Sequence, residues 1–274
     1  MPEYVICNLC GQDRTQIIQK AESPYQVVKC LNCGLVYTNP QPTLNKIGTH
    51  YQETYYRDWI DKQMERRIQM WKKRLKDVQG FKSSGHILDV GCGIGTFLNL
   101  AKEFGYAVKG TEISEFGSKY VKEKLGIDVF KGDVKEARFL SNHFDIVTLW
   151  HTLEHVPDPS SLLKEIHRIL KTDGLLVIAV PNVHNSITKF LYFLARRRKL
   201  KLFSIDAKEW HFYHFSIRTL SSLLKKTGFD IIKNEMDLSQ IEPSKKTVDC
   251  LARIVHTVTG KNFGEALKVY ATKI

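Results

Sequence analysis

The sequence lacks any long apolar run, and this absence argues against an integral membrane protein. No stretch of its 274 residues approaches the roughly 18 apolar residues that a membrane-spanning helix requires. The first residues also lack the positively charged and apolar segments of a secretory signal. Internal repeats and low-complexity segments are missing as well. We therefore expect a soluble, cytoplasmic protein, and the length suits one medium-sized domain with an attachment.

Cysteine is scarce and unevenly placed. Four of the six cysteines form two CxxC pairs about twenty residues apart, namely Cys7 with Cys10 and Cys30 with Cys33, and a glycine follows each pair. This spacing indicates a metal site rather than a disulfide framework. Four thiolates around one tetrahedral ion predict a zinc ribbon, and the zinc is structural because no coordination position remains for a substrate. The competing interpretation is an ordinary β-hairpin with unligated cysteines.

Acidic residues are outnumbered by basic ones. The chain has 41 lysines and arginines against 29 aspartates and glutamates, which gives a formal charge of +12. Such a surface favours anionic partners, whether nucleic acid, phosphorylated or nucleotide-linked substrates, or acidic lipid. Residues 188–203 combine an apolar patch with a dense basic cluster. Three interpretations of this segment remain open. It contacts a membrane surface, it binds a phosphate-bearing substrate, or it is an amphipathic helix whose basic end is solvated.

A short glycine-rich stretch dominates the middle of the sequence. An apolar strand is expected at 87–90, followed by a turn with Gly91, Gly93 and Gly95 and then by an amphipathic helix. Glycines suit this turn because they adopt backbone angles closed to other residues and let a ligand approach the backbone. Asp89 precedes the first glycine. Glu112 closes the next strand about twenty residues later, where an acid can accept hydrogen bonds from ribose hydroxyls.

Segments 88–96 and 110–114 resemble the class I S-adenosylmethionine-dependent methyltransferases. The resemblance continues in order through 131–134, 144–158 and 170–182, so several motifs support it together. It implies an α/β fold, with a doubly wound Rossmann-like sheet whose last strand is antiparallel. It also implies S-adenosylmethionine as the cofactor.

We expect the chain to consist of three parts. Residues 1–42 form the small zinc-ribbon module, and this ribbon resembles one that precedes many bacterial methyltransferases of sugar and polysaccharide biosynthesis. Residues 43–82 form an aromatic and helical cap with a linker. Residues 83–274 form the cofactor-binding domain, with a basic insertion at about 184–209.

The resemblance also assigns cofactor contacts. An aspartate after the third strand accepts a hydrogen bond from the adenine amino group, the following valine packs on the ring, and tyrosines of the cap face the methionine end. We therefore expect the cofactor to be bound by Asp89, Gly91, Gly93, Glu112, Ile113, Asp133, Val134, Trp150, Tyr51 and Tyr55.

Histidines supply the candidate catalytic groups. Methyl transfer to oxygen or carbon usually requires a base that removes a proton and has a pKa near neutrality. The unperturbed pKa of histidine is already near neutrality, so histidine needs the smallest pKa shift for this role. His151 and His155 follow the strand expected at 144–149, and His211 and His214 lie in an aromatic stretch further along. We expect His155 or His214 to be the base, with His151 and Trp210 shaping the pocket. A purely structural role is the competing interpretation for each of them.

Two absences in the sequence narrow the range of possible acceptor substrates. The (D/N)PP(Y/F) motif of amino-directed nucleic-acid methyltransferases is absent after the fourth strand, and no cysteine lies there to attack a pyrimidine ring. We therefore predict methylation of oxygen, in preference to carbon, on a small or carrier-linked metabolite such as a sugar or polysaccharide precursor. The alternatives are an RNA methyltransferase that uses the ribbon and the basic surface, and a cofactor-binding scaffold without catalysis.

Overall fold

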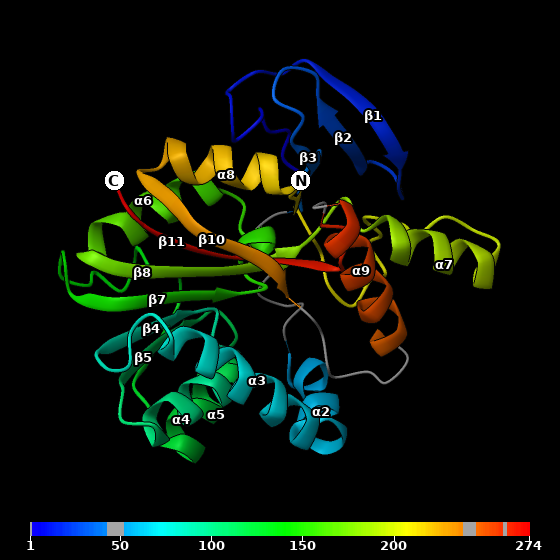
Figure 1. Cartoon of the computed structure of the whole chain (residues 1–274). Coiled ribbons are helices and arrows are strands. Elements are labelled where there is room, and N and C mark those ends of the chain that lie inside the picture. Colours follow the sequence, from blue (N-terminus) through cyan, green and yellow to red (C-terminus); the bar gives the residue numbers. More distant parts are fainter. Residues whose placement is uncertain (1, 43–51, 238–244, 260–261) are drawn as a thin grey trace.

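The computed structural model describes residues 2–42, 52–237, 245–259 and 262–274. Within them lie two β-sheets, the larger flanked by helices on both faces and the smaller formed mainly by the N-terminal segment (Figure 1). No helix in the described ranges is long and apolar enough to cross a membrane.

The larger sheet has seven strands in the order β10-β11-β8-β7-β4-β5-β6. Strands β4 to β8 run parallel, whereas β11 is antiparallel to both of its neighbours, β8 and β10. This arrangement confirms the predicted Rossmann-like fold with an antiparallel last strand. The strands are β4 (His86–Val90), β5 (Ala107–Glu112), β6 (Val129–Lys131), β7 (Phe144–Trp150), β8 (Leu170–Pro181), β10 (Phe229–Asp237) and β11 (Ala266–Lys273).

Helices cover the two faces of this sheet in separate layers. On one face pack α3 (Met64–Gln79), α4 (Thr96–Glu103) and α5 (Glu115–Leu125), preceded by α2 (Glu53–Lys62). On the other lie α6 (Pro159–Ile169) and α8 (Ile217–Lys226) (Figure 1). The side chains of the central strand β7 are therefore buried on both sides, which explains why this strand is apolar along nearly its whole length.

Local capping signals set the starts of three helices. The side chains of Ser114, Asp158 and Ser216 each accept a hydrogen bond from a backbone amide in the first turn of α5, α6 and α8. Pro159 occupies the first position of α6, where its missing amide hydrogen costs nothing. The sequence predicts all three caps, and the structure confirms them.

The end of α6 differs from the sequence-based expectation. Helical spacing predicts that the helix continues through Leu170 and ends at Asp173 and Gly174, but these residues lie inside β8, which already begins at Leu170. Leu170 has an extended backbone and pairs with Phe144 of β7, so it belongs to the strand and not to the helix face. Pairing between strands decides this boundary, and helical spacing alone does not reveal it.

The N-terminal segment forms a sheet with a strand from the far end of the chain. The strands β1 (Thr15–Lys20), β2 (Gln26–Cys30) and β3 (Val36–Thr38) are joined by β9 (Tyr213–His214). In this pairing Val36 faces His214 and Tyr37 faces Tyr213. The ribbon is thus completed by the segment that carries two of the candidate catalytic histidines.

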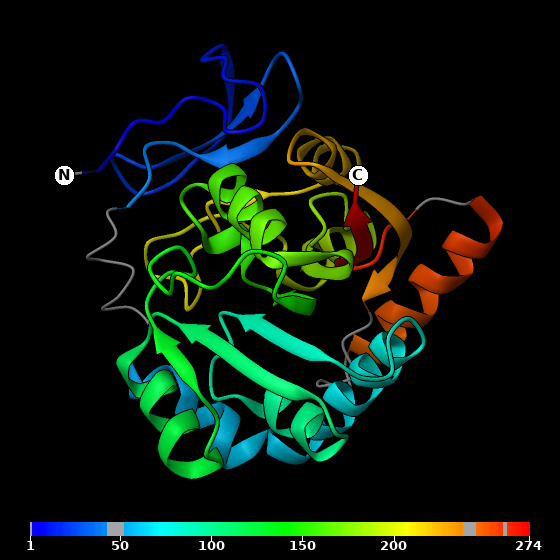
Figure 2. The same ribbon diagram turned by 90° about the vertical axis from the view of Figure 1, so that its left-hand side faces the viewer.

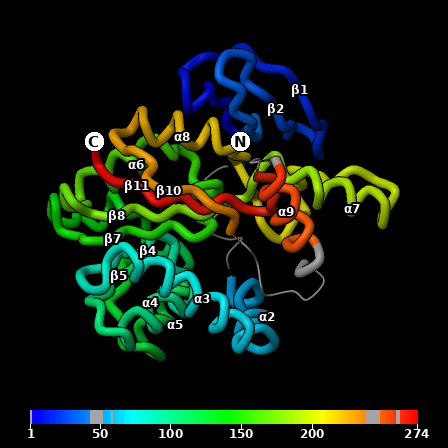
Figure 3. The backbone as a smooth tube through the Cα atoms, viewed as in Figure 1, coloured from blue at the N-terminus to red at the C-terminus, as the bar shows by residue number. Residues whose placement is uncertain are grey.

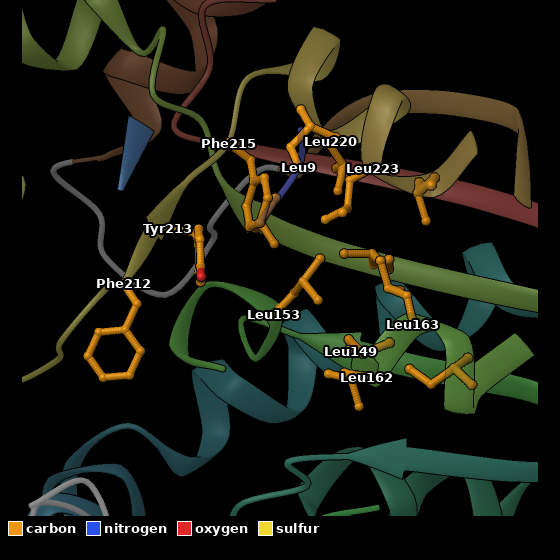
Figure 4. Close-up of a cluster of buried hydrophobic side chains, with 14 of the residues drawn as sticks. Leu9, Leu149, Leu153, Leu162, Leu163, Phe212, Tyr213, Phe215, Leu220 and Leu223 are labelled. Atoms are coloured by element: carbon orange, nitrogen blue, oxygen red, sulfur yellow. The ribbon is translucent and has the colours of Figure 1, made fainter. Parts of the chain in front are cut away.

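The ribbon sits on the layer formed by α6 and α8 (Figure 2). Leu9 packs into the same buried cluster as Phe215, Leu220 and Leu223, so the ribbon shares the domain's core (Figure 4). The Asn8 amide donates a 2.8 Å hydrogen bond to the Asp158 carboxylate at the start of α6.

The helices α7 (Ser186–Arg196) and α9 (Lys245–Thr259) lie next to each other, and α7 projects from the body (Figure 3). Of its apolar side chains, Phe190, Phe193 and Leu194 are exposed, and a basic run follows at 196–199. The amphipathic helix expected in the basic insertion is therefore present.

Candidate active site

A cleft of about 1090 Å³ lies at the carboxyl ends of the central parallel strands. Its walls come from the turn after β4, the ends of β5 and β7, the helices α2 and α3, and the segment that follows α7. Ligands in open α/β sheets bind at this edge. Most of the predicted cofactor residues line this cleft: Tyr55, Asp89, Gly91, Gly93, Glu112, Ile113, Asp133, Val134 and Trp150. Tyr51 lies outside the described residues.

The turn after β4 is held by a buried carboxylate. Gly91 and Gly93 adopt positive φ angles of 73° and 57°, and a Cβ on Gly91 would lie 2.7 Å from the Thr152 side chain. The Glu112 carboxylate accepts hydrogen bonds from the backbone amides of Gly93 at 2.7 Å and Ser114 at 2.8 Å. Burial raises the pKa of this carboxyl. Glu112 therefore connects the ends of β4 and β5 and fixes the floor of the cleft.

Asp89 is a second buried acid at this floor. Its carboxylate accepts a 2.7 Å hydrogen bond from the Thr148 hydroxyl of the neighbouring strand β7. Burial, together with the nearby charge of Glu112, raises the pKa of Asp89 to about 7. Two acids in one buried region thus share the site where the resemblance predicts a cationic cofactor.

Aromatic rings form the wall opposite the glycine turn. Tyr55, Tyr56 and Trp59 of α2 pack edge to face with one another, and the Arg67 guanidinium lies 3.9 Å from the centre of the Trp59 ring. Burial, together with Arg74, lowers the pKa of Arg67 to about 10. A ligand in the cleft would therefore contact both apolar rings and a cation.

Buried hydrogen-bond donors in this wall test whether the predicted cofactor fits. The Nε1 atoms of Trp71 and Trp150 and the Nε of Arg67 have no hydrogen-bond partner among the described residues, and all three side chains line the cleft. Buried donors without partners are costly, so these positions suit a ligand that offers oxygen atoms. S-adenosylmethionine has a carboxylate and ribose hydroxyls, which can accept these hydrogen bonds. The residues present therefore fit this cofactor.

A buried ion pair that the sequence interpretation missed supports the same wall. Arg74 of α3 pairs with Asp237 at the end of β10, and its guanidinium packs 4.7 Å and 4.9 Å from the ring centres of Trp71 and Trp150. The two charged residues are 5% and 6% exposed, respectively. They are 163 positions apart in the chain, so no local pattern could have indicated the pair.

His151 follows β7 with a positive φ of 56° and lies close to this pair. Its ring nitrogens are 3.6 Å from carboxylate oxygens of Asp237 and Glu154. Burial alone would lower the pKa of His151, but the two carboxylates outweigh it and raise the pKa to about 9. The raised pKa and the Arg74 guanidinium 3.3 Å from His151 Nε2 both disfavour this residue as the base.

Three side chains at the rim of β7 form a compact cluster, Glu154 with His155 and His211. One nitrogen or oxygen atom from each lies within 4.8 Å of those of the other two. His155 lines the cleft, its Nδ1 is 2.8 Å from the Trp210 carbonyl oxygen, and its Nε2 is 3.8 Å from Glu154 Oε1. The sequence interpretation included both histidines and missed the carboxylate, although it stands next to His155 in the chain.

Glu209 is a further missed residue in this wall. Its carboxylate accepts a 2.8 Å hydrogen bond from the Tyr55 hydroxyl and lies 3.7 Å from His211 Nε2. Burial would raise the pKa of Glu209, but the neighbouring His211 and His155 and the Tyr55 hydroxyl lower it. Glu209 thus joins α2 to the histidine cluster across the cleft.

His214 lies elsewhere. It is 5% exposed in β9, faces the ribbon strand β3, and is not among the residues that line the cleft. Burial lowers its pKa to about 3. Trp210 also lies off the cleft lining and donates its indole hydrogen to the Ile205 carbonyl. The geometry therefore gives no support to His214 as the base, because β9 pairs with β3 in the ribbon sheet.

The four cysteines of the two CxxC pairs converge on one point. Cys7 and Cys33 have their sulfurs 3.4 Å apart, those of Cys10 and Cys30 are 3.5 Å apart, and all four lie within 4.8 Å of one another. Sulfur ligands around a tetrahedral zinc lie at about 2.3 Å from the metal, which requires sulfurs almost this close. The residues present fit a zinc ion.

Comparisons with known proteins agree with this geometry. The family described as a methyltransferase domain matches residues 60–234. The chain is 35% identical over 114 residues to a demethylmenaquinone methyltransferase of Staphylococcus saprophyticus, a match that covers 39% of this chain and 49% of that protein. It therefore spans about half the length of the curated relatives it matches.

Solved structures show the same fold. An S-adenosylmethionine-dependent methyltransferase from Mesorhizobium loti matches with a TM-score of 0.54 and 19% identity, over 74% of this chain and 98% of that one. One from Archaeoglobus fulgidus matches with a TM-score of 0.53 and 24% identity, over 75% and 94% of the two chains.

Proposed function

Since the chain belongs to the class I S-adenosylmethionine-dependent methyltransferases, we propose that it methylates a hydroxyl oxygen of a small, carrier-linked, anionic metabolite such as a sugar or polysaccharide precursor. The observation that carries this proposal is the cluster of Glu154, His155 and His211, of which His155 lines the cleft. A hydroxyl must lose its proton as it attacks, and imidazole next to carboxylate is suited to that task.

Each part of the cleft has a role in this reaction. The bound cofactor supplies a methyl group on a positively charged sulfur. The Glu112-bound glycine turn holds the cofactor against the backbone, and the aromatic wall excludes water. Burial lowers the pKa of His155, so its ring is neutral at pH 7 and the cluster can assist departure of the hydroxyl proton. With the cofactor bound, the acceptor oxygen would form its bond to the methyl carbon as the carbon–sulfur bond breaks, and its proton would pass to His155 Nε2.

Two features support a carrier-linked, anionic acceptor. Asn185, Thr188 and Leu200, from α7 and its flanks, line the same cleft, so the basic insertion borders the acceptor side. The exposed apolar face of α7 and the basic run at 196–199 together suit a carrier that has both apolar and phosphate groups. The curated relatives named above have a small-molecule acceptor, demethylmenaquinone, in their names.

The test uses labelled methyl groups. The full chain is incubated with methyl-labelled S-adenosylmethionine and a panel of sugar nucleotides, lipid-linked sugars, the matching free sugars and RNA. We expect label in an alkali-stable methyl ether of a carrier-linked acceptor, with little transfer to the free sugar. His155→Asn should abolish transfer, whereas His143→Asn, at the opposite end of β7, should not. Label confined to RNA or to carbon would refute the proposal, and cofactor binding without any transfer would favour a non-catalytic scaffold.

We also infer that Cys7, Cys10, Cys30 and Cys33 hold a structural zinc ion. With four protein ligands the metal has no open position, so it stabilises the ribbon and takes no part in methyl transfer. Its influence on the cleft is indirect, because β3 of the ribbon pairs with β9, close to His211.

A further inference from the structure

We propose that Glu154, His155 and His211 bind a divalent transition-metal ion beside the cleft, which His155 lines, separate from the four-cysteine site. One donor atom from each side chain lies within 4.8 Å of those of the other two. Ligands around an ion with bonds of about 2.1 Å lie about 3 to 4 Å apart, so a small inward movement of these side chains completes the site.

Glu154 provides the second, independent observation. Its side chain is 0% exposed, and neither carboxylate oxygen has a hydrogen-bond partner among the described residues. The closest ring nitrogens, His151 Nδ1 and His155 Nε2, lie 3.6 Å and 3.8 Å from its Oε1, beyond hydrogen-bond distance. Buried carboxylates are costly unless they are hydrogen-bonded, paired or coordinate a metal. The charge of His151 offsets this cost in part, and a metal ion within the cluster would bind the carboxylate oxygens that accept no hydrogen bond.

The orientation of His155 also matches that of a metal ligand. Its Nδ1 is 2.8 Å from the Trp210 carbonyl oxygen, and that contact requires the hydrogen to be on Nδ1. Nε2 then carries the lone pair on the side that faces Glu154. Histidine ligands in metal sites commonly have the other ring nitrogen bound to a carbonyl or carboxylate in this way, which fixes both tautomer and ring orientation.

The ligand set indicates which ions the site takes. Two imidazoles and one carboxylate suit Mn²⁺, Fe²⁺, Co²⁺ or Zn²⁺, whereas Mg²⁺ and Ca²⁺ prefer all-oxygen sites. Three protein ligands leave coordination positions open, and His155 lines the cleft, so a ligand in the cleft could reach an ion held by this cluster.

The chemical consequence rests on the proposed function. An acceptor hydroxyl bound at the open position would have a lowered pKa and would release its proton to water in the cleft. Its oxygen would then form the bond to the methyl carbon as the carbon–sulfur bond breaks, with the bonding pair left on sulfur. His155 would be a ligand in this arrangement, and activation of the hydroxyl would depend on the metal.

The binding test uses the metal alone. The full chain, with its ribbon filled by one equivalent of zinc, is titrated with MnCl₂ while the electron paramagnetic resonance signal of free Mn²⁺ is recorded. Mn²⁺ binds more weakly than Zn²⁺ in the general order of affinities and is not expected to displace zinc from four thiolates. We expect one Mn²⁺ per chain. We expect at least a tenfold weaker affinity in Glu154→Gln, His155→Asn and His211→Gln, since even outer-shell changes weaken metal sites about 10- to 100-fold.

Controls separate the possible failures. His143→Asn removes a histidine at the far end of β7 and should bind Mn²⁺ like the wild type. His211 is partly exposed, so His211→Gln keeps the test meaningful if Glu154→Gln fails to fold. Equal Mn²⁺ binding in the wild type and His211→Gln, or no binding by the wild type, would overturn the inference. S-adenosylhomocysteine binding, measured on the same samples, reports separately on the methyltransferase site.

Discussion

Replacing Glu112 with glutamine should weaken cofactor binding far more than it weakens the fold. The Glu112 carboxylate accepts hydrogen bonds from the amides of Gly93 and Ser114 at 2.7 Å and 2.8 Å, one through each oxygen. Glutamine has the same shape but only one acceptor oxygen. In either orientation its NH₂ group faces one of the two amide donors, so one hydrogen bond is lost and the turn is pushed open.

The magnitude follows from this count. A hydrogen bond to a charged group contributes about 1.5–3 kcal/mol, and each 1.4 kcal/mol is about a tenfold change in affinity. Glutamine also offers one acceptor oxygen fewer to the ribose hydroxyls that Glu112 is expected to bind, so we expect Glu112→Gln to weaken S-adenosylhomocysteine binding about 10- to 100-fold. Burial raises the pKa of Glu112, so the neutral side chain also removes an unfavourable buried charge. The free energy of unfolding should therefore change less than the binding free energy.

The assay is titration calorimetry with S-adenosylhomocysteine, combined with urea unfolding of the same variants. Glu115→Gln is the matched control, because Glu115 stands at the start of α5 and its exposed side chain pairs with Lys131 on the surface. Exposed pairs contribute at most about 1 kcal/mol, so the control should bind almost normally. Unchanged affinity in Glu112→Gln, or an equal loss in both variants, would refute the role assigned to this carboxylate.

Three further predictions concern protons and zinc. The pKa of Asp89 is raised from 3.8 to about 7, so the folded protein keeps a proton on Asp89 that the unfolded chain loses. The free energy of unfolding should therefore fall by a few kcal/mol as the pH rises from about 4 to 7. Urea unfolding should show a smaller fall in Asp89→Asn than in the wild type. The pKa of His214 is lowered from 6.5 to about 3, so the unfolded chain binds a proton there at a higher pH than the folded protein does. The free energy of unfolding should therefore fall as the pH drops below 6.5, and His214→Gln should reduce that fall in the same assay. Replacing Cys7 and Cys33 with serine should remove the zinc and unfold the ribbon, because structural zinc contributes about 10–16 kcal/mol in small domains. Hydrogen exchange at β9 should then accelerate while S-adenosylhomocysteine still binds, and unchanged exchange would contradict the predicted structural role.

The fold was largely predictable because its signals are local. The glycine turn after β4, the apolar run of β7 and the caps at Ser114, Asp158 and Ser216 each extend over a few residues. Their order along the chain indicates the class I methyltransferase fold before any contact is known. Even so, the start of β8 at Leu170 was missed, because it depends on pairing with Phe144 rather than on periodicity.

The candidate site was predictable only in part. The sequence by itself determined most of the motifs that line the cleft, because neighbouring parallel strands bring their carboxyl ends to one edge of the sheet. Only the tertiary structure decided which histidine faces the cleft, that Arg74 pairs with Asp237, and that β9 completes the ribbon sheet. Such contacts join positions from different parts of the chain, and their stability comes from burial and pairing in the folded protein. The spacing of residues along the chain does not indicate such contacts. His155 and His214 were therefore equal candidates in the sequence, and only the fold shows that His155 lines the cleft and His214 does not.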